Sequence, residues 1–238
     1  MPEVEILKTT IIFGASGSIG QAICTHFKEH AHFVIGVARN ESAENSIINW
    51  SGNAQEFSTE IQQLLGVAKI DSVVWAQGIN FNDDIDTFDL DRHLQMYEAN
   101  VTYILNTLKA LMQFDLLEKK ARLCVISSIW QNIARQNKLS YCITKSALQG
   151  LVQSLSVDLG KQGMLINAVL PGALDTVMTR ANLSQEQISL LESITPLSSL
   201  PNLSDVTGLV AYLCSSQNTG ITGQFIAADR GFSNARIL

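Results

Sequence analysis

The sequence predicts an α/β protein of one domain, built as a doubly wound parallel sheet with helices on both faces. Three observations predict this fold class. Short β-rich runs alternate with segments of helical periodicity, which is typical of βαβ units and of parallel sheets. The runs are apolar at successive positions, as expected of strands that are buried on both faces. At 238 residues, the chain is long enough for a single sizeable core.

Strands are expected in six apolar runs, with a helix after the first. The runs cover Thr9–Phe13, Phe33–Ala38, Ser72–Ala76, Arg122–Ser127, Leu165–Leu170 and Gln224–Ala228. Apolar residues from Ile19 to Phe27 then recur at the spacing of a helix with one buried stripe. The pattern is weakest over residues 42–58, where only a short strand around Ala54–Phe57 is expected.

Composition and charge exclude several classes of protein. No internal repeat, low-complexity tract or Pro/Gly-rich linker interrupts residues 1–238, which are predicted to form one domain. The net charge of −6 argues against a nucleic-acid partner, because no excess of Lys or Arg is available to displace counterions. The four cysteines are scattered without a CxxC pair, which favours reduced thiols. No targeting segment or membrane-spanning run is expected, so the protein is predicted to be cytoplasmic, with no membrane partner.

A glycine-bearing turn, GASGSIG, connects the first strand to the first helix. Glycines let the backbone approach a pyrophosphate closely, and the helix N-terminus supplies unpaired N–H groups and the positive end of a dipole. The turn predicts a Rossmann-type dinucleotide site. A plain tight turn is the alternative, because glycines are common in turns. The residues expected to contact the dinucleotide here are Gly14, Ser16, Gly17, Ser18, Ile19 and Gly20.

A second motif, SYCITKSALQG (Ser140–Gly150), places Tyr141 and Lys145 one turn apart at the start of an apolar helix. A phenol and an ammonium would then share one pocket. Taken alone, the pair is equally typical of a partly exposed Tyr and a Lys whose stem lies along an ordinary helix. The order of motifs along the whole chain decides between these interpretations.

Taken in order, the motifs resemble those of the short-chain dehydrogenase/reductase family, from about Thr9 to about Gly231. That family has a glycine turn, an NNAG strand end, an Asn on the next helix, a Ser, a YxxxK pair and a PG turn. The resemblance is greatest to reductases of 3-oxoacyl thioesters. It implies a catalytic set and further contacts to the cofactor. The catalytic set is Asn100, Ser128, Tyr141 and Lys145, and the further cofactor contacts come from Gly78, Pro171, Gly172 and Thr176, together with Tyr141 and Lys145.

This resemblance implies a carbonyl–alcohol chemistry. Hydride transfer to a carbonyl builds negative charge on oxygen, which needs a nearby proton donor. Tyr141 is expected to be this acid, and the ammonium of Lys145 is expected to lower the pKa of the phenol. In the family the Lys also bonds the nicotinamide ribose, the Ser (Ser128) orients the carbonyl oxygen, and the Asn (Asn100) positions a water that links the Lys to solvent. Taken singly, a strand-end Ser is more often a cap, and an Asn at a helix edge is more often an N-cap.

Several positions depart from the family pattern. Ser18 replaces the middle glycine of the turn, and Arg230 replaces the first glycine of the closing DGG. Trp75, Ala76 and Gln77 stand where the family has NNA, so the side-chain amides that usually brace the sheet are missing. Trp75 is expected to be a large core residue. The Asp-Val pair expected near the adenine is also absent.

The end of the second strand predicts which nicotinamide cofactor is used. NAD-selective relatives have a carboxylate here, which accepts bonds from the ribose hydroxyls and repels a 2′-phosphate. This chain has Ala38, followed by Arg39, whose planar guanidinium suits a 2′-phosphate. NADP(H) is therefore predicted to be preferred over NAD(H). The alternative is a solvated Arg in a polar turn.

The substrate is expected between Ile129–Leu139 and Val177–Leu197, under a mobile lid at about residues 177–200. Within the lid, Ser184 and Gln187 predict a capping box for a short helix with Ile188 and Leu191 facing inward.

Two other sets of polar residues invite functional interpretations. Arg135 and Arg180 are placed to meet an anionic substrate group, although a solvated charge is the commoner role for each. His26, His30 and His32 are spaced like transition-metal ligands. The end of an exposed helix is the favoured interpretation, and no metal site is predicted.

The sequence thus predicts an NADP(H)-dependent oxidoreductase that acts on a small-molecule ketone or secondary alcohol and, as in the family, forms a homodimer or homotetramer. One alternative is a dinucleotide-binding sensor or scaffold with little turnover, against which the complete catalytic set argues. Another is an enzyme that modifies sugar nucleotides on the same fold, against which the short C-terminal part argues. Acyl thioesters, sugar-nucleotide ketones, steroids and small alcohols all stay open as substrates, as does the direction of reaction.

Overall fold

A parallel sheet forms the centre of the protein in the computed structural model, which describes residues 7–38 and 47–234. Within these residues the sheet has seven strands in the order β3-β2-β1-β4-β5-β6-β7. The winding reverses between β1 and β4, which is the kind of switch point where α/β sheets bind ligands. The strands are β1 (Thr9–Phe13), β2 (Phe33–Val37), β3 (Ile47–Ile48), β4 (Ile70–Trp75), β5 (Leu117–Ile126), β6 (Leu165–Pro171) and β7 (Phe225–Ala228).

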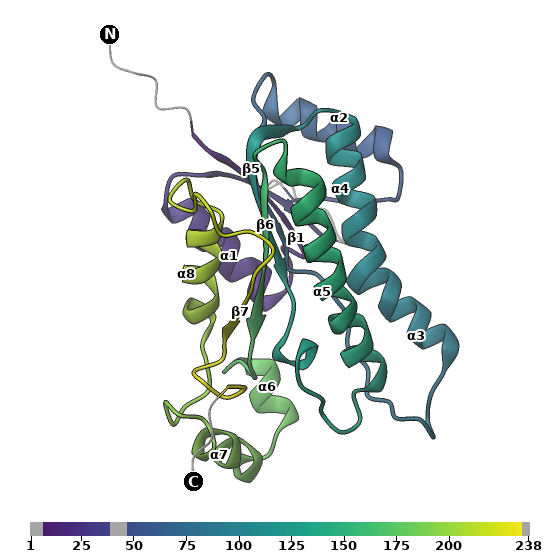
Figure 1. Cartoon of the computed structure of the whole chain (residues 1–238), viewed down its shortest axis with the longest axis vertical. Helices are drawn as coiled ribbons and strands as arrows, with labels where there is room; N and C mark the ends of the chain where they lie inside the picture. Colours follow the sequence, from purple (N-terminus) through teal and green to yellow (C-terminus); the bar gives the residue numbers. More distant parts are fainter. Residues whose placement is uncertain (1–6, 39–46, 235–238) are drawn as a thin grey trace.

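Helices cover both faces of the sheet (Figure 1). One face carries α1 (Ser18–Glu29) and α8 (Leu203–Leu213), which pack against each other. The other face carries α2 (Ala54–Leu65), α4 (Tyr103–Gln113) and α5 (Leu139–Gly160), while α3 (Leu90–Tyr97) continues into α4 through a π-helical turn, Glu98–Thr102. Two short helices, α6 (Val177–Asn182) and α7 (Gln185–Ser193), lie beyond the carboxyl edge of the sheet (Figure 1). The predicted doubly wound α/β class is confirmed.

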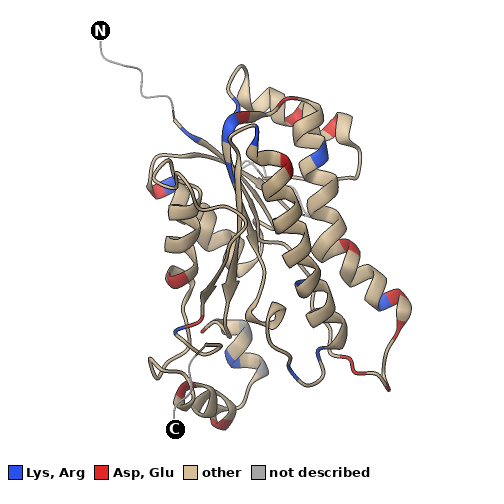
Figure 2. Ribbon diagram, in the orientation of Figure 1, with Lys and Arg blue, Asp and Glu red and all other residues tan. Residues whose placement is uncertain are grey.

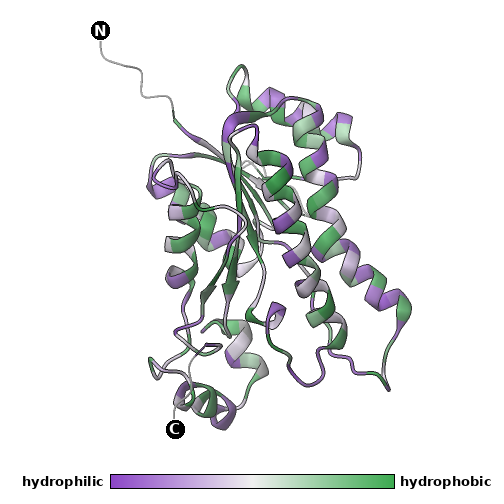
Figure 3. Cartoon of the chain, viewed as in Figure 1, coloured by the Kyte–Doolittle hydropathy of each residue, from purple (hydrophilic) through white to green (hydrophobic). Residues whose placement is uncertain are grey.

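Successive residues of each strand pack into two apolar layers, one on each face of the sheet. In β1, Ile11 and Phe13 belong to the layer under α2, α4 and α5, whereas Ile12 belongs to the layer under α1 and α8. All three side chains are fully buried. The strands are mostly apolar in the middle of the sheet (Figure 3), although β5 begins with the charged residues Glu118, Lys119 and Lys120, and this matches the apolar runs in the sequence.

Charged side chains lie mainly on the peripheral helices and loops, and the centre of the sheet is nearly free of them (Figure 2). This distribution follows from the cost of burying an unpaired charge. Of the helices that the structure describes, none combines the length and the apolar character needed to cross a lipid bilayer.

The expected strand at Ala54–Phe57 is wrong, because these residues begin α2. The side chain of Asn53 accepts hydrogen bonds from the backbone N–H groups of the first turn and so starts the helix. Phe57 and Ile61, four residues apart, are buried on one side of it. The edge strand is instead the two-residue β3, which pairs with the end of β2.

Residues 175–201 form an excursion from the carboxyl edge of the sheet whose two ends meet. The N–H of Asp175 donates to the carbonyl oxygen of Pro201 at 2.8 Å. Within the excursion, α7 begins with the predicted capping box, in which Ser184 and Gln187 each bond the backbone of the other. Ile188 is buried, as the helical pattern predicts.

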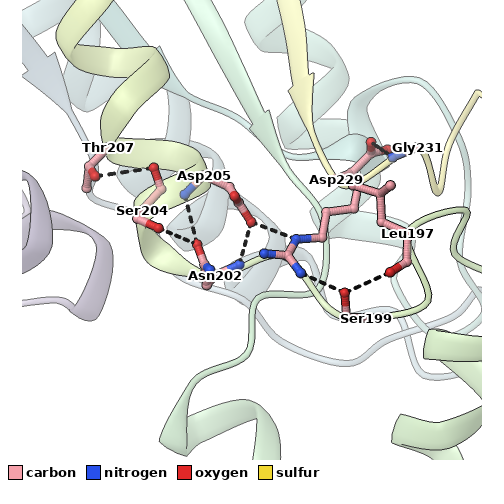
Figure 4. A network of polar contacts seen from close by, with 9 residues as sticks. Leu197, Ser199, Asn202, Ser204, Asp205, Thr207, Asp229 and Gly231 are labelled. Carbon is pink, nitrogen blue, oxygen red and sulfur yellow. Dashed lines mark hydrogen bonds and ion pairs between the residues drawn. The ribbon is translucent and has the colours of Figure 1, made fainter.

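The far end of this excursion is tied to the body of the protein by Arg230. The guanidinium donates to Ser199 Oγ at 2.6 Å and pairs with Asp205 at 2.9 Å. Asp205 also completes a capping box with Asn202 at the start of α8 (Figure 4). Arg230 has a φ of 56°, the left-handed region that favours glycine, so its side-chain contacts offset a strained backbone.

Candidate active site

The turn after β1 requires both of its outer glycines. Gly14 has a φ of 79°, and a Cβ there would lie 2.5 Å from the backbone N of Gln77. A Cβ on Gly20 would lie 2.1 Å from the carbonyl oxygen of Gly14. Helix α1 begins at Ser18, and its N-cap, Gly17, provides no side-chain hydrogen bond to the first turn. The N-terminus of α1 therefore keeps N–H donors available for an anion.

Replacing Gly20 by Ala is expected to lower the melting temperature, because the methyl group would overlap backbone atoms that have no room to move. Overpacking of this kind costs about 1–3 kcal/mol, and each kcal/mol corresponds to roughly 2–4 °C for a chain of this size. Thermal unfolding without cofactor measures the effect. Gly17→Ala is the matched control, since the nearest atom to its Cβ is 3.5 Å away. Equal melting temperatures for the two variants would contradict this account of the turn.

Lys145 is buried beside Tyr141 near the start of α5. Its Nζ donates to the carbonyl oxygen of Ile126, the last residue of β5, at 3.1 Å and lies 5.7 Å from the centroid of the Tyr141 ring. Only 4% of the Lys145 surface is exposed. Burial lowers the pKa of its ammonium to about 8. The one-turn spacing thus gives the shared environment that the sequence predicts.

The pKa of Tyr141 differs from expectation. Burial raises it to about 12, and a hydrogen bond to Ser128 acts in the opposite direction but is outweighed. The predicted lowering by Lys145 is therefore not found, because loss of hydration disfavours the phenolate more than the site's donors stabilise it. At neutral pH Tyr141 holds its proton and is in the acid form.

Ser128 follows the end of β5 and has two roles. Besides bonding Tyr141, its Oγ accepts from the N–H of Trp130 at 3.3 Å and caps the short 3₁₀ turn Ile129–Gln131. The cap interpretation and the site interpretation of this residue are therefore compatible.

Asn100 lies inside the π-helical turn between α3 and α4, not at a helix N-cap. Its amide bonds both backbone groups of Ile79, at 2.8 and 3.1 Å, and donates to Thr144 Oγ1 at 3.0 Å. Gly78 lies close to both Asn100 and Lys145. A Cβ at this position would be 2.9 Å from Asn100 Oδ1 and 3.9 Å from Lys145 Nζ. π-Helical turns are frequent at functional sites, and this one joins the loop after β4 to α5 beside Lys145.

The remaining predicted cofactor residues lie at the same edge of the sheet, with one exception. Pro171 ends β6, Gly172 follows it, and Thr176 caps α6 by accepting from the N–H of Thr179 at 3.2 Å. Arg39 lies outside the residues that the structure describes. Its neighbour Ala38 is buried directly after β2.

The side chains that replace the family's NNA behave in different ways. Trp75 is fully buried, stacks on Phe13 at 5.7 Å between ring centroids and donates to Thr107 Oγ1 at 2.9 Å. This confirms Trp75 as a core residue. Both polar atoms of the Gln77 amide are buried without a hydrogen-bond partner among the described residues. Gln77 is thus no substitute for the missing sheet braces.

The histidines and one of the two arginines have structural partners. His30 bonds the carbonyl oxygen of His26, and His32 bonds Thr10 Oγ1. No group of three or more metal-binding side chains occurs within residues 7–38 and 47–234. Arg180 forms a two-point ion pair with Asp175, at 2.6 and 2.8 Å.

A cavity of about 270 Å³ lies next to Ser128, one of the predicted catalytic residues. Its walls begin at Ile129, one residue after Ser128, and at Ala173, one residue after Gly172, and α7 closes another side. The two segments expected to flank the substrate both contribute to it. The sequence pattern missed Pro201, Asp229 and Phe232, which reach the cavity only through tertiary packing.

A contact between α3 and α5 was also missed. His93 Nδ1 lies 2.8 Å from the Oγ of Ser140, the residue before Tyr141, and the N–H of Ser140 donates to Asp83 at 3.0 Å. These bonds hold the first turn of α5 in place. Nothing in the sequence pattern connects His93 with Ser140, which lies 47 residues further along the chain.

Comparison with known proteins identifies the family. The family described as Enoyl-(Acyl carrier protein) reductase matches residues 14–233. The 3-oxoacyl-[acyl-carrier-protein] reductase FabG of Rickettsia felis is 30% identical over 240 residues, covering 94% of this chain and 96% of that protein. The L-rhamnose 1-dehydrogenase (NADP(+)) of Thermoplasma acidophilum is 26% identical over 245 residues, with 94% and 95% covered.

Solved structures agree with this result at the level of the fold. The gluconate 5-dehydrogenase of Burkholderia cenocepacia, solved in complex with NADP and tartrate, is similar with a TM-score of 0.86 at 20% identity, over 96% of each chain. The family match extends from the glycine turn to the residues after β7 and includes the Tyr141–Lys145 pair. The chain therefore belongs to the short-chain dehydrogenase/reductase family of oxidoreductases.

Proposed function

We propose that this protein is an NADP(H)-dependent oxidoreductase that transfers a hydride between nicotinamide and a ketone or secondary alcohol. The observation that carries the proposal is the convergence of Ser128, Tyr141 and Lys145 at the carboxyl edge of the sheet, beside a cavity. A relative named as an NADP(+)-linked dehydrogenase and another named as a 3-oxoacyl reductase support it.

The residues at the carboxyl edge fit a dinucleotide. Gly14, Gly20 and Gly78 allow the turn after β1, the start of α1 and the loop after β4 to pack more closely than a Cβ would permit, and the N-terminus of α1 lacks a side-chain cap. We assign the pyrophosphate to Gly14, Ser16, Gly17, Ser18, Ile19 and Gly20. The nicotinamide half is assigned to Gly78, Tyr141, Lys145, Pro171, Gly172 and Thr176.

The bound nicotinamide would supply the hydride in reduction or accept it in oxidation. Ser128 Oγ then holds the carbonyl oxygen, and Tyr141 donates its proton to that oxygen as negative charge develops. A pKa of about 12 keeps the phenol protonated at neutral pH, which suits the direction of reduction. Lys145 holds its charge beside the phenol and bonds the ribose, while Asn100 fixes the loop that borders Lys145.

The proposal is tested by screening ketones with NADPH and alcohols with NADP, following nicotinamide absorbance. Turnover of a ketone or secondary alcohol supports it. Tight cofactor binding without turnover of any substrate favours the sensor or scaffold, and conversion of a sugar nucleotide without net oxidation favours an epimerase or dehydratase. Either result overturns the proposal.

NADPH is expected to bind more tightly than NADH, because Arg39 is suited to a 2′-phosphate and Ala38 offers no carboxylate to repel it. A charge-assisted hydrogen bond contributes about 1.5–3 kcal/mol, which corresponds to roughly a ten- to hundredfold preference. Titration of both cofactors on the wild type, Arg39→Ala and Ala38→Asp measures it. Equal affinities in the wild type, or an Arg39→Ala change that weakens NADH as much as NADPH, would refute the assignment.

We further propose a cytoplasmic location, which the scattered cysteines favour, and a homodimer or homotetramer, as the family resemblance implies. Light scattering on the purified protein gives the number of subunits.

A further inference from the structure

The cavity beside Ser128 has walls that are mostly apolar. Of the thirteen residues that line it, nine are apolar. They come from the turn after Ser128, from the lid and from the C-terminal part of the chain. The apolar residues are Ile129, Trp130, Ala173, Leu183, Leu190, Leu191, Leu200, Pro201 and Phe232.

The polar groups in the walls are mostly committed to the protein itself. Asp229 accepts from the N–H groups of Gly231 and Ser233, at 2.9 and 2.8 Å, and from the hydroxyl of Ser233. Thr195 Oγ1 donates to the carbonyl oxygen of Leu191 at 2.7 Å. Gln187 accepts from the N–H of Ser184 at 2.9 Å as part of the capping box.

The fourth polar residue of the walls, Arg135, is exposed to solvent, and its guanidinium lies 5.9 Å from the centroid of the Trp130 ring. It is therefore a residue of the rim and not of the interior. A substrate with several hydroxyl groups would lose its bound water in this cavity and find few free hydrogen-bond partners in the walls. Unpaired polar groups of this kind disfavour binding strongly, so the cavity should reject such a substrate.

We infer that the substrate is a ketone, or the matching alcohol, with an apolar alkyl or aryl group that fills this cavity, and not a polyhydroxylated sugar or sugar acid. The inference rests on the proposed function and specifies its substrate class. A cavity of about 270 Å³ exceeds the roughly 150 Å³ that suffices for benzene, so an aromatic ring with a short chain, or an alkyl chain of comparable size, fits.

The test compares straight-chain 2-ketones from butanone to octanone, and acetophenone, with glucose, rhamnose and gluconate as substrates for oxidation. With NADPH, kcat/KM is expected to rise about fourfold per added methylene until the cavity is full. The polyols should react at least about a hundredfold less well. Leu191→Asn, which puts an amide in the wall, should reduce the gain per methylene. Leu197→Asn is the control, since Leu197 is 67% exposed and is not among the lining residues.

Quenching of Trp130 fluorescence by acetophenone, with Trp130→Phe as blank, reports binding in the cavity independently of turnover. It therefore separates the inference about the substrate class from the proposal that the protein is an oxidoreductase. Turnover of polyols without selectivity for alkyl chains overturns the inference and leaves the oxidoreductase proposal standing. Saturable quenching without any turnover supports the cavity assignment and overturns the oxidoreductase proposal. Absence of both quenching and turnover overturns both.

A separate observation concerns Gln77, directly beyond the end of β4. Both atoms of its amide are buried, and neither has a partner among the described residues. Buried amides are nearly always bonded, since an unsatisfied one costs stability. Gln77 adjoins the glycine turn, because a Cβ on Gly14 would touch its backbone at 2.5 Å. The backbone of Gln77 therefore borders the turn that we assign to the dinucleotide, and its amide is the buried polar group beside that turn that has no partner in the described part of the chain.

We infer that the Gln77 side chain binds the dinucleotide, pairing its amide with a polar group of the cofactor such as a ribose hydroxyl. An amide both donates and accepts, which matches a hydroxyl group. The unsatisfied amide of Gln77 then lowers the stability of the protein without cofactor. Because the amide gains hydrogen bonds when the dinucleotide binds, the same group raises the affinity for the cofactor.

The test is Gln77→Met, which keeps the length of the side chain and removes its polar atoms. Without cofactor, the melting temperature is expected to rise by roughly 2–10 °C. Calorimetric titration with NADPH should show binding that is roughly three- to tenfold weaker. Gln217→Met is the control for replacing a Gln by a Met, because Gln217 is exposed and is not among the residues that we assign to the dinucleotide. A lower melting temperature in Gln77→Met, or unchanged NADPH affinity, would overturn the inference.

Discussion

Tyr141→Phe is expected to lower kcat by roughly 10²- to 10⁴-fold, the contribution of a well-placed general acid. The variant keeps the ring that packs beside Lys145 and loses only the hydroxyl that bonds Ser128. Since we propose that Tyr141 acts on the substrate oxygen, cofactor affinity should stay nearly constant. Steady-state kinetics and NADPH titration on the same preparation separate the two quantities.

Tyr97→Phe serves as the matched control, because Tyr97 is 37% exposed at the end of α3 and is not part of the catalytic set. It should change kcat by less than about twofold. A Tyr141→Phe enzyme that turns over within a few-fold of the wild type would remove Tyr141 from the mechanism. Loss of cofactor affinity together with kcat would instead indicate a wider disturbance of the site.

Lys145→Met is expected to have opposite effects on stability and function. Burial lowers the pKa of Lys145 from 10.5 to about 8, so the folded protein holds this proton less tightly than the unfolded chain does. The penalty is fully present below about pH 8 and disappears as the pH rises from there toward 10.5. A shift of this size corresponds to about 3 kcal/mol, so the variant should gain up to that amount of unfolding free energy at pH 7.

The functional effect of Lys145→Met should be a large loss of turnover and weaker binding of NADPH, because the ribose contact and the charge beside Tyr141 both disappear. Urea unfolding at pH 7 and at pH 10 measures the gain in unfolding free energy, and titration measures the binding of NADPH. Lys161→Met, at an exposed position after α5, should change neither. A Lys145→Met variant less stable than the wild type would contradict the free-energy cost that we assign to burying the ammonium. Normal NADPH binding by this variant would contradict the proposed ribose contact.

The sheet was largely predictable because its strands carry their own signal. Thr9–Phe13 and Leu165–Leu170 are apolar at most of their buried positions, so their place in a two-sided sheet follows from composition. The helical signal at the start of α2 was present in the sequence, because Asn53 is a good N-cap and Phe57 and Ile61 have the i, i+4 spacing of one buried helix face. The strand was expected because Ala54–Phe57 was considered without Ile61, which lies beyond residues 42–58.

The part of the candidate site that follows the order of the motifs along the chain was predictable, because all strands of a parallel sheet end at the same edge of the sheet. Ser128 follows β5 and Gly172 follows β6 for that reason. The high pKa of Tyr141 was not predictable, because it depends on how many groups from distant segments exclude water from the phenol. The cavity wall formed by Phe232 and Pro201 has the same origin in tertiary packing.

The hydrogen bond between Asp175 and Pro201 has an evolutionary consequence. Because the two ends of residues 175–201 already meet, exchanging this segment for one of another length leaves the junction with the sheet unchanged. Doubling the length of such a loop adds only about 0.6 kcal/mol of closure entropy. The segment that forms much of the cavity wall can thus change in length and sequence while the strand ends that carry Ser128 and Gly172 stay in place, which would let related proteins diverge in the compounds they accept.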